Sequence, residues 1–257
     1  MRNIPPVNQT HQIIQSEYRA SHRRLFLFDY DGTLTPIKNH PAHAHVSPEL
    51  RATLEALSGN LENTVAIVSG RKAEDLDERF GSLPIALVAE HGAAMKLPGA
   101  LWQQIVPDVS DWIDVAASIM KRASALLPDS FVEEKQYSVV LHTRHSDPQK
   151  AKLAIKVTST KLRAALSGTS AELLLGKQVL EVRHKEAHKG NAAVLLARNG
   201  SYDFVLGAGD DTTDEDLFAA IPQGFTIRIG RAKTNAAFRI STVSEFLTLL
   251  STLVEPA

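Results

Sequence analysis

The fold of this chain is decided by the stretch Leu25-Phe26-Leu27-Phe28-Asp29-Tyr30-Asp31-Gly32-Thr33-Leu34-Thr35. Its first four residues form a continuous apolar run, which is typical of a strand buried in a sheet. The run ends abruptly in two carboxylates, Asp29 and Asp31, which are followed by a glycine and a threonine. An open α/β sheet presents its chemistry at the carboxyl ends of its strands. We therefore expect an α/β core with both acids at such an end.

The two acids suit phosphoryl transfer. A carboxylate can attack phosphorus and form an aspartyl phosphate, which divides one difficult hydrolysis into two easier steps. The first acid, Asp29, is the candidate nucleophile, and Asp31 is the candidate general acid and base. Gly32 lets the chain turn without a side-chain clash, and backbone N–H groups in such a turn can hold phosphate oxygens. A carboxylate that approaches a phosphate dianion is repelled, so a cation is needed, and hard oxygen ligands indicate Mg²⁺.

The same acids have two simpler interpretations. Asp and Gly favour turns, so an isolated Asp-x-Asp-Gly is more often a solvated turn than a catalytic site. A calcium loop that began at Asp29 would need glycine and glutamate where this chain has Leu34 and His40, so that interpretation fails. The catalytic interpretation therefore depends on residues further along the chain.

The composition limits the class of protein. A length of 257 residues allows one large domain or two modest ones, and 44% hydrophobic residues are ordinary for a globular core. A net charge of −1 gives no electrostatic case for nucleic acid or for an anionic membrane. Without cysteine there is no disulfide or cysteine zinc site, which fits a cytoplasmic protein.

The N-terminus lacks an apolar core of signal-peptide length, and no apolar run reaches the ~20 residues of a membrane helix. We expect a soluble protein.

Strands alternate with helices in the first and last parts of the chain, which predicts a parallel sheet. The strands expected there are 25–28, 64–68, 85–89, 204–206 and 225–229, and the helices are 9–20, 48–59, 72–80, 191–198, 214–220 and 244–253.

The pattern changes near Pro107 to helix, two strands, helix, two strands, which is typical of a separate α+β unit. Its expected elements are helices 110–127 and 147–166 and strands 130–135, 137–144, 171–175 and 178–183. We therefore predict a Rossmann-like parallel-sheet core made of residues 1–106 and 185–257. Residues 107–184 would be inserted into it as an αββαββ domain.

Three further polar clusters follow expected strands or open a helix. Ser69 follows strand 64–68, and its hydroxyl could bind a phosphoryl oxygen, although Ser-Gly is a common turn. Lys189 could neutralise phosphate charge, although a solvated lysine is the default. Residues 207–216 contain two glycines and five acids; acids at the end of a strand suit a cation, but they also favour the start of a helix. The Gly-x-Gly there lacks a third glycine, so it gives little support for a dinucleotide fold.

The order Asp-x-Asp-Gly-Thr, then Ser, then Lys, then Gly-Asp-Asp-x-Thr-Asp-Glu resembles that of the haloacid dehalogenase (HAD) superfamily. The resemblance assigns Asp29 as nucleophile and Asp31 as acid and base. It makes Ser69 and Lys189 contacts of the phosphate. Asp214 would support a metal through water or through Lys189. The implied Mg²⁺ site is formed by Asp29, Asp31, Asp210 and Asp214.

Six stretches resemble, more narrowly, the trehalose-6-phosphate phosphatases. They are Phe28–Ile37, Val68–Arg71, Ala89–Gly92, Val132–Lys135, Leu180–Arg183 and Gly209–Glu215. The resemblance implies Mg²⁺-dependent hydrolysis of trehalose 6-phosphate to trehalose and phosphate, the last step of trehalose biosynthesis. It also implies that residues 107–184 are a C2-type cap over the sugar. The implied substrate contacts are Arg71, His91, Glu133, Lys135, Arg144, Lys177 and Glu181.

Charged cap residues make sense because each buried sugar hydroxyl needs a hydrogen-bond partner. Glu133 and Lys135 share one face of an expected strand, although charges on a solvated strand face would look the same. The chain departs from the family at Thr143, where Tyr is usual, and at His184, where Pro is frequent. We expect these departures to affect substrate contacts more than catalysis.

Two alternatives stay open. The same core could serve sucrose phosphate, mannosyl-phosphoglycerate or a mutase reaction. The chain could also be a noncatalytic regulatory domain, because such domains occur in this family beside trehalose-6-phosphate synthase domains. The intact acids at positions 29, 31 and 210 favour activity. The expected partners are a disaccharide phosphate and, by resemblance, a trehalose-6-phosphate synthase, with no nucleic acid and no membrane.

Overall fold

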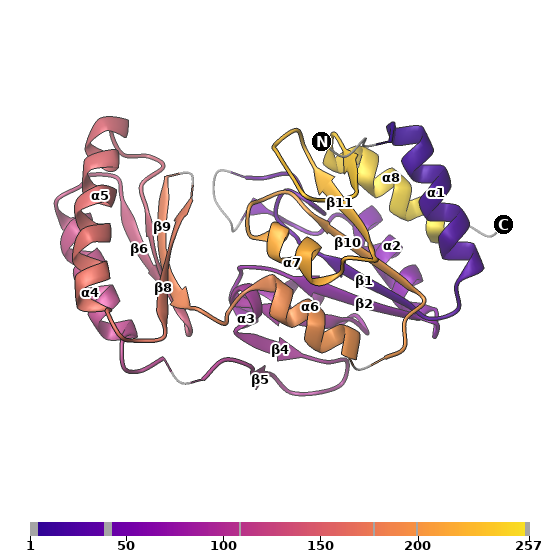
Figure 1. The fold of residues 1–257 in the computed structure, drawn as a ribbon, viewed down its shortest axis with the longest axis horizontal. Coiled ribbons are helices and arrows are strands. Elements are labelled where there is room, and N and C mark those ends of the chain that lie inside the picture. The colour runs from indigo at the N-terminus through magenta and orange to yellow at the C-terminus, as the bar shows by residue number, and fades with distance from the viewer. Residues whose placement is uncertain (1–4, 39–42, 108, 177, 199, 255–257) are drawn as a thin grey trace. The chain divides into compact units, whose positions relative to one another are not determined.

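The computed structural model describes residues 5–38, 43–107, 109–176, 178–198 and 200–254. The chain divides into two compact units, one from residues 1–104 and 188–257 and the other from residues 105–187. Figure 1 shows the elements of both. None of the helices within the described ranges combines the length and the apolar character needed to cross a membrane.

The first unit is built on a sheet with the strand order β12-β11-β10-β1-β2-β3-β4-β5. Neighbouring strands from β12 through β11, β10, β1 and β2 to β3 pair in parallel. Strands β4 and β5 extend the sheet with antiparallel pairing. The bounds are β1 Arg24–Phe28, β2 Asn63–Val68, β3 Ala86–Ala89, β4 Ala94–Lys96, β5 Gln103–Gln104, β10 Phe204–Gly209, β11 Phe225–Ile229 and β12 Phe238–Ile240. Every residue of β1 is buried, as expected for a parallel strand covered on both faces.

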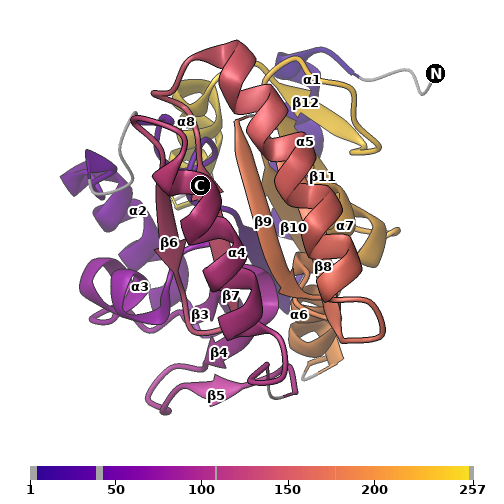
Figure 2. The ribbon, with the colours of Figure 1, turned by 90° about the vertical axis from the view of Figure 1, so that its left-hand side faces the viewer.

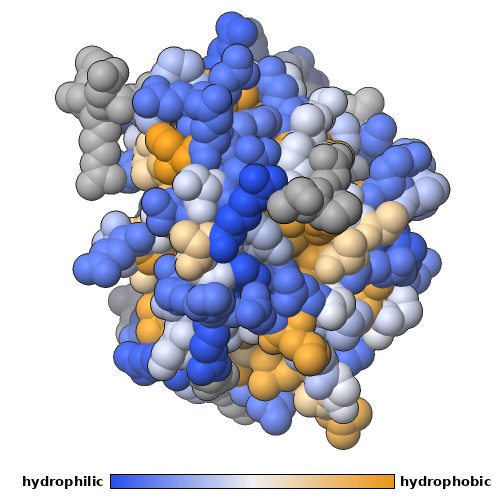
Figure 3. All heavy atoms as spheres, turned by 90° about the vertical axis from the view of Figure 1, so that its right-hand side faces the viewer, coloured by the Kyte–Doolittle hydropathy of each residue, from blue (hydrophilic) through white to orange (hydrophobic). Residues whose placement is uncertain are grey.

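Helices cover both faces of this sheet. They are α1 Val7–Ala20, α2 Pro48–Gly59, α3 Ala73–Phe80, α6 Lys189–Arg198, α7 Asp214–Ala220 and α8 Val243–Val254. The apolar side chains of α1, α2, α3 and α8 join one buried cluster with those of the strands. Helices α6 and α7 lie over the other face (Figure 1), where Gly207 of β10 leaves room for Leu217 and Ile221. Helix α1 buries Thr10 and Ile14 and turns polar residues outward, to the largely hydrophilic face in Figure 3.

Helix α2 begins as its sequence predicts. The Ser47 hydroxyl accepts a hydrogen bond from the N–H of Leu50 at 3.2 Å, and Pro48 is the first helical residue. Both are features of helix N-termini. Leu54 and Leu57 are buried on the same face as Leu50, so the helix packs against the sheet through this leucine stripe.

The second unit has the predicted order of helix, two strands, helix, two strands. Its elements are α4 Ile113–Ala125, β6 Phe131–Glu134, β7 Ser138–His142, α5 Pro148–Ala165, β8 Ala171–Gly176 and β9 Val179–His184. The strands form an antiparallel sheet in the order β6-β7-β9-β8. Helices α4 and α5 cover one face of it (Figure 2). Val139, Leu141, Leu180 and Val182 share one face and are fully buried.

Some elements differ from the sequence-based expectation. Strands β4, β5 and β12 were not predicted, because each has only two or three residues and no periodicity can show in so short a segment. Helix α4 begins only after Trp112, so it is shorter than the predicted 110–127. Strand β6 ends at Glu134, which leaves Lys135 outside the strand on which it was expected.

Candidate active site

Asp29 and Asp210 follow two neighbouring strands of the central sheet. Strands β1 and β10 pair in parallel, with Phe28 opposite Ala208. The N–H of Asp29 donates to the carbonyl of Ala208 at 3.0 Å, so the chain leaves both strands at the same edge. Strand β2 lies on one side of β1 and β10 on the other. This edge is therefore a topological switch point, where open α/β sheets bind ligands.

A buried lysine joins two of the predicted acids. Lys189, the first residue of α6, places Nζ 2.6 Å from Asp29 Oδ1 and 2.7 Å from Asp214 Oδ1. The side chains of Lys189, Asp214 and Asp29 are 2%, 0% and 8% exposed. Burial works against the charge of Lys189, but the two carboxylates outweigh it and raise the pKa of the lysine. The other oxygen of Asp29 accepts from Thr33 Oγ1 at 3.1 Å, so Asp29 is held at both oxygens.

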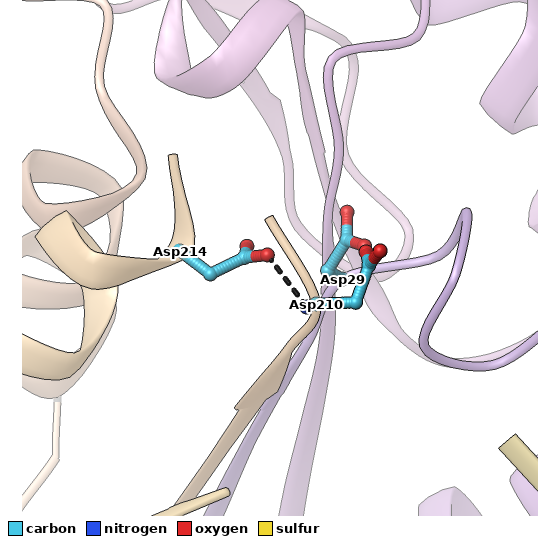
Figure 4. A group of neighbouring side chains, drawn as sticks. All are labelled: Asp29, Asp210 and Asp214. Carbon is cyan, nitrogen blue, oxygen red and sulfur yellow. Dashed lines mark hydrogen bonds between the residues drawn. The ribbon is translucent and has the colours of Figure 1, made fainter. Parts of the chain in front are cut away.

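Asp214 also shapes the loop that carries Asp210. Its Oδ2 accepts a hydrogen bond from the N–H of Asp210 at 2.9 Å (Figure 4). It accepts a second from the N–H of Asp211 at 2.8 Å. Gly209 permits this approach, because a Cβ there would overlap the Asp214 carboxylate. A Cβ on Gly32, which has a φ of 89°, would overlap the Asp210 carboxylate. Both glycines thus let the backbone lie directly against the acids.

Asp29, Asp210 and Asp214 fit a cation. Each offers a carboxylate oxygen, and these oxygens lie within 4.8 Å of one another (Figure 4). Burial raises the pKa of Asp29 well above its usual value; Lys189 opposes this effect, and the carboxylates of Asp214 and Asp210 add to it. Burial and Asp214 also raise the pKa of Asp210, to about 7. A divalent cation would relieve this repulsion, and an all-oxygen ligand set suits Mg²⁺.

The Asp31 carboxylate binds Arg71 and lies outside this group of acids. Arg71 Nε contacts Asp31 Oδ2 at 2.6 Å, and Nη2 contacts Oδ1 at 2.8 Å. The side chain of Arg71 is 5% exposed and that of Asp31 is 36% exposed. The sequence predicted Asp31 among the metal ligands and Arg71 among the substrate contacts, whereas in the structure the two side chains bind each other.

Ser69 and His91 lie beside that ion pair, after strands β2 and β3. Ser69 Oγ accepts from the N–H of Arg71 at 3.3 Å, and the N–H of His91 donates to the Ser69 carbonyl at 2.9 Å. A Cβ on Gly70 would meet the His91 imidazole, so the ring packs directly on this turn. His91 has a φ of 59°, a left-handed conformation that is uncommon outside glycine. Both predicted residues therefore lie at the carboxyl edge of the sheet.

Glu133 and Glu181 share one face of the sheet in the second unit. Both lie opposite Val140 in the strand register, and opposite residues of antiparallel strands point to the same face. Glu133 Oε2 lies 2.9 Å from His142 Nε2. The imidazole stacks on Phe131 with ring centroids 4.5 Å apart. This face combines hydrogen-bond acceptors with aromatic rings, which suits binding of a polyhydroxy compound.

The other contacts predicted in this unit are Lys135, Arg144 and Lys177. Lys135 lies in the turn between β6 and β7, where its N–H donates to the Ser138 carbonyl at 2.9 Å. Arg144 is exposed and follows β7, at the opposite end of the same strand pair. Lys177 lies outside the described residues.

Two residues at the site were not predicted from the sequence. The Thr33 hydroxyl donates a hydrogen bond to the Asp29 carboxylate. The position of Thr33, four residues after Asp29 in the same turn, could have indicated this contact. Asp75 of α3 accepts from Arg71 Nη1 at 2.6 Å. The two residues are four positions apart, but Arg71 precedes α3, which begins at Ala73, so no helical spacing indicated the contact.

The sequence matches a known family over most of its length. The family model described as trehalose-phosphatase matches residues 27–244. The chain is 38% identical over 244 residues to the "Bifunctional trehalose-6-phosphate synthase/phosphatase" of Thermoproteus tenax, which covers 95% of this chain and 33% of the relative. The chain spans between a quarter and a third of the length of the first curated relatives that it matches.

Solved structures share the fold. The C-terminal domain of trehalose-6-phosphate phosphatase from C. albicans is 30% identical, with a TM-score of 0.90 and coverage of 98% of both chains. A haloacid dehalogenase-like hydrolase from B. subtilis has a TM-score of 0.63 at 14% identity, covering 88% of this chain and 97% of that one, and therefore shows the fold alone. The predicted α/β fold and the HAD resemblance are confirmed. The chain belongs to the trehalose-phosphatase family, and its fold is that of the HAD superfamily.

Proposed function

We propose that the chain hydrolyses trehalose 6-phosphate to trehalose and phosphate, in a Mg²⁺-dependent reaction that passes through an aspartyl phosphate. The observation that carries the proposal is the group formed by the buried Asp29, Lys189 and Asp214 with the partly buried Asp210, at the switch point of the sheet. The group combines a carboxylate nucleophile, a lysine that faces it and a set of oxygen ligands. Membership of the trehalose-phosphatase family supports the choice of substrate.

In the first half of the reaction, Asp29 is the nucleophile. One of its oxygens bonds to phosphorus, the bond between phosphorus and the sugar oxygen breaks, and Asp31 donates a proton to that oxygen. Lys189 and Thr33 hold the Asp29 carboxylate in place, at 2.6 and 3.1 Å. The lysine charge also offsets that of the incoming phosphate, as preorganised charge does in many active sites.

In the second half, Asp31 acts as a base. It takes a proton from water, the water oxygen bonds to phosphorus, and the bond between phosphorus and Asp29 breaks. This step releases phosphate and restores both acids to their starting forms. The Asp31 side chain is 36% exposed, which is compatible with access of water to its carboxylate.

We propose that Asp29 and Asp210 hold the Mg²⁺, with Asp214 in support through Lys189. When bound, the ion supplies positive charge that offsets the repulsion between nucleophile and phosphate. Because the Asp31 carboxylate binds Arg71, we assign Asp31 the acid and base role and not that of a ligand through its side chain. Ser69, which follows β2, is proposed to contact the phosphate.

We propose that the second unit is the cap predicted from residues 107–184 and that it recognises the disaccharide. Glu133 and Glu181 lie on one face of its sheet, where their carboxylates can accept hydrogen bonds from sugar hydroxyls. Such bonds matter because a hydroxyl buried without a partner costs binding free energy. Lys135, Arg144, Lys177 and His91 stay predictions as further contacts.

A substrate panel tests the proposal. Phosphate release is measured from trehalose 6-phosphate, sucrose 6-phosphate, mannosyl-phosphoglycerate and glucose 6-phosphate, each with Mg²⁺ and after chelation with EDTA. We expect the highest kcat/KM with trehalose 6-phosphate and loss of release after chelation, with recovery on adding Mg²⁺. A preference for another sugar phosphate would contradict the substrate. No release from any of them by the folded chain would favour a regulatory domain.

We also infer that the chain works beside a trehalose-6-phosphate synthase. The name of the T. tenax relative combines the two activities, and this chain covers 33% of its length. Size-exclusion chromatography of the chain mixed with such a synthase should show a joint peak. Separate elution of the two proteins at micromolar concentration would contradict a stable association.

A further inference from the structure

Asp31 stands at one end of a row of four alternating charges. Arg71 binds Asp31 through Nε and Nη2, and it binds Asp75 through Nη1 at 2.6 Å. On the far side, Arg79 Nη1 lies 3.2 Å from Asp75 Oδ1. When Asp31 is ionised, the row Asp31–Arg71–Asp75–Arg79 is neutral as a whole, and each inner charge lies between two charges of opposite sign.

The arginines anchor this row to the core of the first unit. The Arg71 side chain is 5% exposed, and its guanidinium lies over the ring of Tyr30, 5.2 Å from the centroid. The Tyr30 hydroxyl donates to the Ala44 carbonyl at 2.9 Å. Arg79 Nε donates to the same carbonyl at 3.2 Å. Asp31 is 36% exposed, so a partly open carboxylate is held from inside by a buried cation.

We propose that Asp75 is a positioning residue for the acid and base step and that it acts on Asp31 through Arg71. The proposal rests on the proposed function, because it requires Asp31 to be the acid and base. The donors of a guanidinium lie in one plane at fixed angles. The contact of Nη1 with Asp75 therefore fixes the rotation of the plane whose other two donors hold both oxygens of Asp31.

Without Asp75, Nη1 of the buried Arg71 loses this carboxylate, and one of the contacts that fix the guanidinium plane is removed. A turn of the plane moves both contacts to Asp31 at once. A misplacement of about 1 Å can cost on the order of 100-fold in rate. Asp75→Ala should therefore lower kcat/KM for trehalose 6-phosphate by roughly 10- to 100-fold, mainly through kcat.

The dependence on the leaving group separates a positioning role from a general structural one. Phenyl phosphate and p-nitrophenyl phosphate are close in size, but p-nitrophenolate leaves without a proton, whereas the more basic phenolate gains from one. The ratio kcat/KM reports the steps up to departure of this group. Asp75→Ala should lower kcat/KM for phenyl phosphate about tenfold more than for p-nitrophenyl phosphate. An equal loss on both substrates overturns the proposal.

A double-mutant cycle tests whether Asp75 acts through Asp31. In the Asp31→Asn background, Asp75→Ala should lower kcat/KM by less than about twofold, because no acid is left to position. The same loss as in the wild-type background overturns the proposal. Asp75→Asn retains an oxygen that can accept from Arg71, so it should keep more of the rate than Asp75→Ala.

Glu74→Ala is the matched control. Glu74 is exposed and precedes Asp75 in the first turn of α3, so both acids interact favourably with the helix N-terminus. This variant should keep the wild-type kcat/KM with all substrates. Thermal unfolding shows which variants are folded, and Asp75→Asn replaces Asp75→Ala in both assays if the alanine variant is not.

Failure of the proposed function would look different from failure of this inference. Wild-type protein that releases no phosphate from trehalose 6-phosphate would contradict the proposed function, and the aryl phosphate pair would then decide the role of Asp75. Release from none of these substrates would overturn both proposals.

Discussion

The two units carry their charged side chains in opposite ways. In the first unit, Asp29 and Asp214 are almost fully buried, and both bind the buried Lys189. In the second unit, Glu133 and His142 lie on a sheet face with side chains that are 30% and 23% exposed. Buried ions must be paired before any substrate arrives, whereas partly exposed groups can exchange water for other hydroxyl groups.

This difference separates the reaction from the choice of substrate. A preorganised cluster stabilises charge at phosphorus whatever alcohol is bound to it. Hydrogen bonds from a partly exposed face depend on the particular alcohol, because a site built to bond a hydroxyl rejects a compound that lacks it. Substitutions in one unit should therefore leave unchanged the property that the other unit governs.

Asp29→Asn should have the largest effect. The amide is a poor nucleophile, so kcat for trehalose 6-phosphate and for aryl phosphates should fall by on the order of 10⁴-fold or more. Phosphate release and circular dichroism measure activity and folding together. Glu55→Gln, which removes an exposed carboxylate of α2, is the control and should be fully active. Near-normal release by Asp29→Asn would contradict the nucleophile assignment.

Lys189→Met should have the largest effect on stability. It leaves Asp29 and Asp214 buried without their cation, which should lower the free energy of unfolding by about 3–5 kcal/mol. The comparison is Lys121→Met in the second unit, where Lys121 Nζ lies 2.8 Å from Glu134 Oε1 but the side chains are 56% and 49% exposed. That change should stay within about 1 kcal/mol.

Urea unfolding of both lysine variants measures the two losses of stability. The two ion pairs have similar lengths, so a difference in their energies reflects burial. Equal losses of stability in the two variants would contradict the contrast between the units.

Glu133→Ala and Glu181→Ala should affect substrate choice alone. Each should lower kcat/KM for trehalose 6-phosphate by roughly 10- to 100-fold, through lost hydrogen bonds to charged groups. Turnover of p-nitrophenyl phosphate should change by less than about twofold, because it has no sugar to bind. Glu134→Ala is the matched control, since Glu134 neighbours Glu133 on β6 and binds Lys121. Equal losses on both substrates would argue against sugar recognition by this face.

The core was predictable because its signals are local. Strand β1 is a continuous apolar run, as central parallel strands are, and the acids at its end are adjacent to it in the sequence. Helix α7 has the bounds expected from Asp214 to Ala220, because acids mark its first turn. Strands β4, β5 and β12 escaped prediction because they are too short to show a period.

The site was predictable only in part, because side-chain direction is not a local property. The motifs indicated that Asp29, Lys189 and Asp214 belong together, and the structure brings them within hydrogen-bond distance. Nothing in the motifs shows that Arg71 turns toward Asp31, because that contact joins segments 40 residues apart. Lys135 and Arg144 lie at opposite ends of the strand pair because of the register of β6 on β7. A single sequence does not specify this register.

Asp77→Asn should have the smallest effect on the free energy of unfolding. It tests whether the strength of an ion pair depends on burial or on membership of the first unit. Lys96 Nζ and Trp102 Nε1 contact its carboxylate at 2.5 and 2.6 Å, but the side chains of Lys96 and Asp77 are 24% and 35% exposed. Burial opposes ionisation of Asp77, but the hydrogen bonds from Lys96 and Trp102 outweigh it and lower the pKa. Because the folded pKa lies below the unfolded one, the stability gained is present at neutral pH and lost as pH falls through the folded pKa. Asp77→Asn should therefore cost less than about 1 kcal/mol at neutral pH, and its unfolding free energy in urea should approach that of the wild type as the pH falls below the usual range of a carboxyl pKa. A loss as large as that of Lys189→Met, or one that does not narrow on acidification, would mean that exposed pairs of the first unit are as strong as its buried ones.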